Sequence, residues 1–140
     1  MITTGVRSLG KVLPLMLALA GGGTALAGGL AGSEWCPLQL GGNEVPDSGT
    51  VFLRFEAGGR LSGHNGCNGF FGSYEITGER IAIGPLGATS MACEEPVMAL
   101  ETAFMQALEQ ARGFARDGIR LELTDEQGGT SAIFIQTDWD

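Results

Sequence analysis

Apolar and polar residues alternate along several short stretches of the chain, which is the pattern of β-strands with one buried face. The alternation is clearest at 51–56, where Val51, Leu53 and Phe55 occupy every second position, and it recurs at 70–76. Shorter or Gly-interrupted runs indicate further strands at 60–66, 81–83 and 133–135. Because the intervening turns are short, we expect neighbouring strands to pair antiparallel.

The segment EWCPLQLGG, residues 34–42, predicts a short strand at the edge of the sheet. Pro37 has no backbone N–H, so it is tolerated where that position faces solvent or where a strand begins. Trp35 is expected to anchor this strand, and the polar residues 43–49 form a loop after it.

The hydrophobic period changes between residues 94 and 112. Val97, Leu100, Phe104, Leu108 and Ala111 recur at intervals of three and four, which places them on one face of a helix. A proline in the first turn, acidic residues at the start and a glycine after the end mark its boundaries. An amphipathic helix in a small β domain usually supplies core, so we expect this face to be buried.

A hairpin is predicted within FARDGIRLELT, residues 114–124. Asp117-Gly118 is a strong signal for a tight turn between two strands. Ile119, Leu121 and Leu123 then fall on one face of the second strand.

Four glycines lie inside strand-like sequence, at positions 63, 66, 69 and 72. A phosphate-binding loop would need a helix directly after them, whereas the apolar alternation continues as strand. We therefore expect bulges or sharp coiling of the sheet. The order of elements predicts one α+β domain, a strongly curved antiparallel sheet or incomplete β-barrel with one packed α-helix.

Residues 1–27 resemble a secretory signal peptide. Arg7 and Lys11 precede a short apolar run, and Ala25-Leu26-Ala27 offers a cleavage site before Gly28. No cysteine directly follows a small-residue box, so we expect no lipid anchor, a flexible lead-in at 28–33, and a periplasmic or secreted product without stable membrane insertion. Cleavage would leave six arginines against sixteen acidic residues, changing the formal charge from −8 to −10. Such a charge disfavours nucleic acid as a partner.

Candidate chemistry centres on the single histidine and the three cysteines. His64 and Cys67 have a His-x-x-Cys spacing, which Cys93 or Cys36 would have to complete as a metal site. Tetrahedral zinc usually has four ligands in paired short spacings, and Cys-x-x-Cys does not occur here, so we expect no metal and no other cofactor. A Cys67 nucleophile with His64 as its base lacks an evident third group to orient it.

Other polar residues have ordinary structural explanations. Asn65 and Asn68 lie in a Gly-rich stretch, where asparagine commonly hydrogen-bonds a turn. The acidic pairs 94–95 and 125–126 contain the residue types of a glycosidase dyad, but a helix start and a turn are usual solvated positions for carboxylates. We expect no catalytic residues.

Several segments together resemble the META domain family, which includes the HslJ-like heat-shock proteins. The matching segments are EWCPLQLGG (34–42), GRLSGHNGCNGFFGSY (59–74), IGPLGATSMAC (83–93), the helix ALETAFMQALEQA (99–111) and GIRLELTDEQGG (118–129). The signature residues are Gly66, Cys67, Asn68 and Gly72 in the first motif and Thr89, Met91 and Cys93 in the second. The resemblance assigns residues 34–138 to one such domain.

The resemblance implies an HslJ-type α+β fold without established catalytic activity, often exported and linked to stress tolerance in bacteria. Each signature contains one cysteine, so in an oxidising compartment the simplest disulfide joins Cys67 to Cys93 and leaves Cys36 as a thiol. Pairing of Cys36 with either of the others remains the alternative.

The expected function is that of a non-catalytic envelope module that binds another envelope protein in a stress-related role. The alternative is a carrier of a small apolar ligand inside the barrel. Such a cavity would be lined by Phe52, Phe70, Phe71, Phe104 and Met105. The simpler interpretation is that these five side chains fill the core.

Overall fold

The computed structural model describes residues 29–46 and 50–137, so the predicted signal peptide lies outside the described residues. The strands are β3 (Ser33–Leu40), β4 (Asn43–Glu44), β5 (Phe52–Glu56), β6 (Arg60–His64), β7 (Gly69–Thr77), β8 (Arg80–Ile83), β9 (Gly87–Ala88), β10 (Gly113–Asp117), β11 (Arg120–Thr124) and β12 (Thr130–Thr137). A 3-10 turn spans Ala57–Gly59, and helix α2 spans Glu95–Gln110. Within the described residues, no helix has the length and apolar character needed to cross a membrane.

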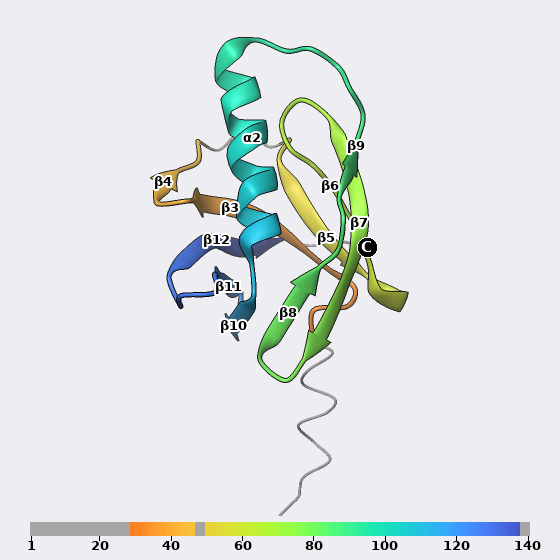
Figure 1. The fold of residues 1–140 in the computed structure, drawn as a ribbon, viewed down its shortest axis with the longest axis vertical. Coiled ribbons are helices and arrows are strands. Elements are labelled where there is room, and N and C mark those ends of the chain that lie inside the picture. Colours follow the sequence, from red (N-terminus) through yellow and green to blue (C-terminus); the bar gives the residue numbers. More distant parts are fainter. Residues whose placement is uncertain (1–28, 47–49, 138–140) are drawn as a thin grey trace, which may run out of the picture.

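The strands form an antiparallel β-barrel (Figure 1). Neighbours pair in the order β3, β5, β6, β7, β8, β10, β11, β12, and β12 pairs again with β3. The expected incomplete barrel is therefore not confirmed, because the ring of pairings closes. Its weakest join is between β8 and β10, where Gly113 opposite Arg80 is the one ladder pair.

Strand β3 is a central strand, and its prediction as an edge strand is wrong. It pairs with β12 along one side and with β5 and β4 along the other. However, β5 pairs with residues 33–35 and β4 with residues 39–40, so Pro37 lies between the two partners. The register against β12 also shifts beside Pro37. This local break accommodates a proline in a central strand.

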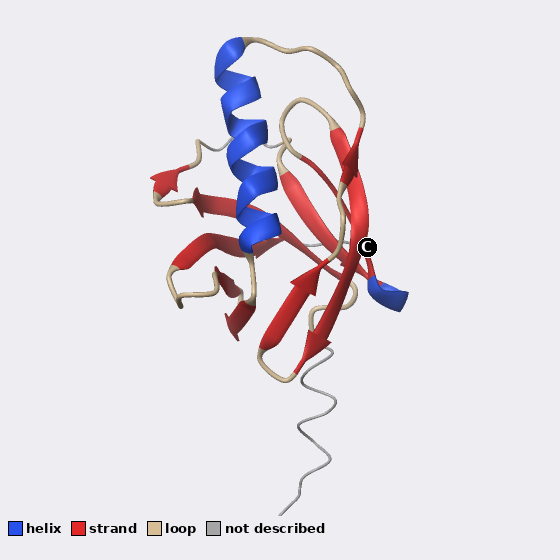
Figure 2. Ribbon diagram, in the orientation of Figure 1, coloured by secondary structure: helices blue, strands red, loops and turns tan. Residues whose placement is uncertain are grey.

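Helix α2 packs its apolar face into the barrel, as predicted. Phe104, Ala107 and Leu108 are buried, and the Phe104 ring lies 5.4 Å from that of Phe70 and 6.1 Å from that of Phe134, measured between centroids. Figure 2 shows this long helix against a wall made otherwise of strands. The helix therefore contributes core to the domain, not an exposed stripe.

Residues 29–33 belong to the fold, so the flexible lead-in predicted at 28–33 does not describe them. Leu30 is 1% exposed and lies in the main apolar cluster. The backbone N–H of Gly32 donates to the carbonyl of Phe55, and that of Ser33 donates to the carbonyl of Leu30. A buried apolar side chain and paired backbone groups fix this segment.

The hairpin of β10 and β11 has its turn one residue later than predicted. Asp117 pairs with Arg120, which leaves Gly118 (φ +63°) and Ile119 as the loop. Leu121 and Leu123 are buried as expected, but Ile119 is 60% exposed. A turn residue does not follow the alternation of the strand beside it, which explains this error.

Candidate functional site

The two signature motifs meet at one end of the barrel. The β6–β7 loop, residues 65–68, and the connection from β9 to α2, residues 89–94, lie together at the top of Figure 1. A disulfide joins Cys67 to Cys93 across a Cα–Cα distance of 6.0 Å, which confirms the predicted pairing. Cys36, on β3 opposite Ile135, takes no part in it.

Asn65 shapes the β6–β7 loop from inside. Its buried side-chain oxygen accepts hydrogen bonds from the backbone N–H groups of Cys67 (3.1 Å) and Asn68 (2.7 Å). Its own backbone N–H donates to the carbonyl of Asn68. These bonds agree with the prediction that Asn65 hydrogen-bonds a turn.

Asn68 bridges the two motifs. Its Oδ1 accepts from the hydroxyl of Thr89 (2.8 Å) and the backbone N–H of Met91 (2.7 Å). Its Nδ2 donates to the carbonyl of Met91 (3.3 Å) and to Oε2 of Glu101 (2.9 Å). Two acceptor and two donor interactions use the full hydrogen-bonding capacity of an amide side chain, so Asn68 is buried and satisfied.

Glu101 connects this network to helix α2, a role that was not predicted from the sequence. Its Oε2 also accepts from Nδ2 of Asn65 at 3.4 Å. The signal was present in the helical pattern. Glu101 falls on the same stripe as Val97, Phe104 and Leu108, and a carboxylate within an apolar stripe indicates a specific polar partner.

Two signature glycines allow close approach of other segments. Gly66 has φ +102°, and a Cβ there would lie 3.3 Å from the side chain of Leu100 on α2. A Cβ on Gly72 would lie 2.8 Å from the side chain of Leu86 and 2.9 Å from the carbonyl of Pro85. These glycines therefore serve backbone conformation and packing.

The metal and nucleophile interpretations of His64 and Cys67 do not match this geometry. Cys67 is in the disulfide, so its sulfur is not a thiolate. This sulfur lies 3.3 Å from the carbonyl oxygen of Met91 but carries no proton, so the contact is not a hydrogen bond. Nδ1 of His64 accepts from the backbone N–H of Gly66 at 3.2 Å. Over residues 29–46 and 50–137, no three His, Cys, Asp or Glu side chains gather in a metal-binding arrangement.

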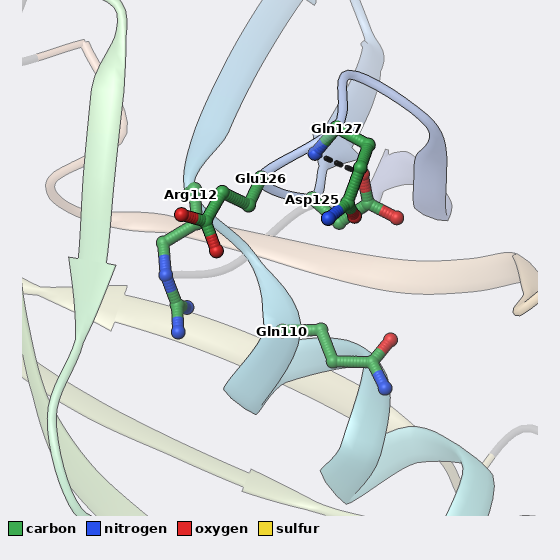
Figure 3. Close-up of a pocket in the computed structure, with 5 residues that line it drawn as sticks. All are labelled: Gln110, Arg112, Asp125, Glu126 and Gln127. Atoms are coloured by element: carbon green, nitrogen blue, oxygen red, sulfur yellow. Dashed lines mark hydrogen bonds between the residues drawn. The ribbon is translucent and has the colours of Figure 1, made fainter.

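The acidic pairs also take structural positions. Glu94 is the N-cap residue of α2 and Glu95 lies in its first turn. Oδ1 of Asp125 accepts from the backbone N–H groups of Gln127 (3.0 Å) and Gly129 (2.8 Å), which shapes the turn before β12. The adjoining surface pocket has a volume of about 280 Å³ (Figure 3) and is lined by Gln110, Arg112, Asp125, Glu126 and Gln127.

The five residues proposed to line a ligand cavity do not come together. Phe70 and Phe104 are buried against each other, and Met105 is partly buried against the same core. Phe71 is 59% exposed, and Phe52 lies under the guanidinium of Arg54 at 4.6 Å from the ring centroid. Phe52 and Phe71 occupy outward positions because alternate residues of a strand face opposite sides of the wall.

Two large apolar side chains are left exposed near the joined motifs. Met91 is 60% exposed, although both its backbone N–H and its carbonyl are bonded to Asn68. Phe71 lies opposite Ser62 on one side and Gly87 on the other. A Cβ on Gly87 would lie only 2.7 Å from a ring atom of Phe71, so the ring covers that glycine.

Comparisons with solved structures support the fold. An NMR structure of a protein from Burkholderia xenovorans matches with a TM-score of 0.65 and 22% identity, over 98% of this chain and 100% of that one. A crystal structure of a DUF4847 family protein from Bacteroides vulgatus matches with a TM-score of 0.60 and 18% identity, over 79% and 96%. No curated protein matches the sequence. The META domain family model matches residues 28–138, and the chain therefore belongs to the META domain family.

Proposed function

We propose that this protein is an exported, non-catalytic META domain that acts as a stress-related interaction module in the bacterial envelope. The observation that carries the proposal is the exposure of Met91 and Phe71 on segments whose backbones are firmly held. We name these two side chains the apolar pair.

Fixed backbones make these side chains suitable anchors. The segment containing Met91 is bonded to Asn68 and lies two residues from the disulfide at Cys93. Phe71 is held between two strands by ladder pairing. Ordering a flexible loop on binding lowers affinity, so exposed apolar groups on a preorganised surface bind at smaller entropic cost.

Charge indicates the chemistry of the partner. Glu94 and Glu95 are both exposed and follow Met91 closely in the chain, and the whole sequence has a formal charge of −8. A complementary surface would be basic around an apolar side chain. We therefore propose a basic segment of an envelope protein as the partner.

The polar residues of the motifs support a non-catalytic role. Asn65, Asn68 and Glu101 are bonded to one another or to backbone, and the two cysteines are oxidised. A site that performs acid–base or nucleophilic chemistry presents such groups to a substrate. Here they hold two loops together.

Binding of synthetic peptides tests the proposal. The probes are a Lys-rich peptide containing leucine and phenylalanine and a peptide in which glutamate replaces each lysine. We expect salt-sensitive binding of the basic peptide, with NMR shift changes at Phe71 and residues 87–95. Met91→Ser should weaken this binding at least tenfold. Ile119→Ser should not, because Ile119 is equally exposed but lies in the β10–β11 hairpin, away from the joined motifs in Figure 1.

Other outcomes contradict the proposal. Equal binding of both peptides, or equal effects of the two substitutions, would exclude the apolar pair as a specific surface. Saturable binding of an apolar fluorophore that shifts Phe70 and Phe104 instead would favour the carrier alternative. In cells, Met91→Ser should reproduce the stress phenotype of a deletion strain while Ile119→Ser does not.

A further inference from the structure

We propose that Asn68, supported by Glu101, is a positioning residue for oxidation of Cys67 and Cys93. Its hydrogen bonds align the β6–β7 loop and the 89–93 segment before the disulfide forms. The inference is independent of the proposed interaction surface.

Asn68 is placed where alignment of the two thiols requires a bridge. It directly follows Cys67, and its side chain bonds to both the backbone N–H and the carbonyl of Met91, two residues before Cys93. A third bond between the segments comes from the hydroxyl of Thr89. None of these bonds involves a sulfur atom, so all can form while both thiols are reduced.

Glu101 keeps the bridging amide in one orientation. Its Oε2 accepts from Nδ2 of both Asn68 and Asn65, while Oδ1 of Asn65 holds the loop backbone beside Cys67. Glu101 thus connects the loop to helix α2. Without this alignment, two cysteines separated by 26 positions must meet by closure of a flexible loop, at an entropic cost that rises with loop length.

Burial differs between the cysteines and sets an order for the reaction. Cys67 is 2% exposed, whereas Cys93 is partly exposed just before the N-cap residue Glu94. The Cys93 thiolate attacks one sulfur of a small-molecule disulfide such as glutathione disulfide, forming a mixed disulfide and releasing one glutathione thiolate. The Cys67 thiolate then attacks the Cys93 sulfur of the mixed disulfide and displaces the second glutathione thiolate. Two protein thiols lose two electrons and two protons, and glutathione disulfide becomes two glutathione thiols.

The alignment is measured by equilibrating the protein with reduced and oxidised glutathione. The equilibrium gives the effective concentration that the Cys67 and Cys93 thiols have toward each other. The protein carries Cys36→Ser so that only one pair reacts, and acid quenching with mass spectrometry counts the species. We expect Asn68→Ala to lower the effective concentration about 10- to 100-fold, because the three neutral hydrogen bonds between the two segments are lost. The mixed disulfide at Cys93 should accumulate.

A matched variant separates alignment from general stability. Ser131 is another buried polar residue, and its hydroxyl donates to the carbonyl of Leu123 at 3.3 Å, far along the chain from the motifs. Ser131→Ala should leave the effective concentration within about twofold. An equal fall in Ser131→Ala, or no fall in Asn68→Ala, overturns the proposal.

Two further measurements test the proposal even if Asn68→Ala folds poorly. Asn68→Asp places a carboxylate beside Glu101, and adding Glu101→Gln restores a donor facing it, so the double variant should recover part of the loss. In the reduced Cys36→Ser protein, the Met91 amide should remain protected from hydrogen exchange through its bond to Asn68. No recovery in the double variant, or an unprotected Met91 amide, would show that the disulfide aligns the segments instead.

Discussion

Removal of the disulfide tests how the joined motifs stabilise the domain. In Cys67→Ala/Cys93→Ala the folded state keeps the hydrogen bonds of Asn68, so the main change is in the unfolded chain. The disulfide closes a loop with a sequence separation of 26. The loop-entropy relation then gives a loss of about 3.5 kcal/mol in the free energy of unfolding. Domains of this size have about 5–15 kcal/mol in total, so the variant should still fold.

Urea unfolding followed by circular dichroism measures this loss. Alanine is the better replacement because serine at the buried position 67 would add a hydroxyl without an assigned partner. Wild-type protein reduced with dithiothreitol provides a second determination and should lose a similar amount. Stability within about 1 kcal/mol of the oxidised protein would refute the loop argument, and failure of the variant to fold would refute the role given to the Asn68 network.

Three further predictions concern the barrel. Phe104→Ala should lower stability by about 3–5 kcal/mol in urea unfolding, since its ring is fully buried, while the exposed Gln110→Ala should change it little. Leu30→Ala should cost about 2–5 kcal/mol, and Ile119→Ala should be nearly neutral; equal effects would show that residues 29–33 are not part of the core. Burial raises the pKa of Tyr74 above its usual 10.0, so the stability that its neutral form contributes persists below that pH and declines as the pH rises through the folded pKa. Absorbance titration of this single tyrosine should give a midpoint above 10.0 in the folded protein and near 10.0 in urea.

Local periodicity predicted the elements well because burial of one face determines the pattern of a strand or helix. The helix expected at 94–112 spans Glu95–Gln110, and Phe104 and Leu108 are buried. The alternation at 51–56 corresponds to β5, where Leu53 and Phe55 face the core. Each of these patterns reports a property of a single segment.

Local periodicity could not predict the closure of the barrel, because closure depends on pairing between strands that are distant in the chain. Strand β3 looks like an edge strand locally, and only its pairing with β12, about a hundred residues later, makes it central. Leu30 was likewise assigned to a glycine-rich lead-in, although the Phe55 carbonyl and the core hold that segment in place.

The cysteine pairing of the candidate site was predicted, but the hydrogen bonds that connect its loops to helix α2 were not. The resemblance supplied the pairing of Cys67 with Cys93. The asparagines were correctly expected to be structural, yet their reach to Glu101 crosses more than thirty residues. Phe70 and Phe71 do not differ in hydrophobicity, but neighbouring residues of a strand face opposite sides, so the alternation at 70–76 already argued against placing both rings in one cavity.

The division of roles at the joined motifs bears on how function should be sought in this domain. The residues that usually attract attention as reactive, namely cysteine, asparagine and glutamate, are the ones that contact each other and fix the loops. Met91, whose backbone is bonded to Asn68, and Phe71, which is held by the pairing of β7 with its neighbours, are exposed apolar side chains without acid–base or nucleophilic groups. A substitution within the network is therefore expected to change both the stability of the domain and the position of Met91, so a loss of the proposed peptide binding would have two explanations. Only substitutions at Met91 and Phe71 themselves, which leave the hydrogen bonds of Asn68 in place, can separate recognition from folding.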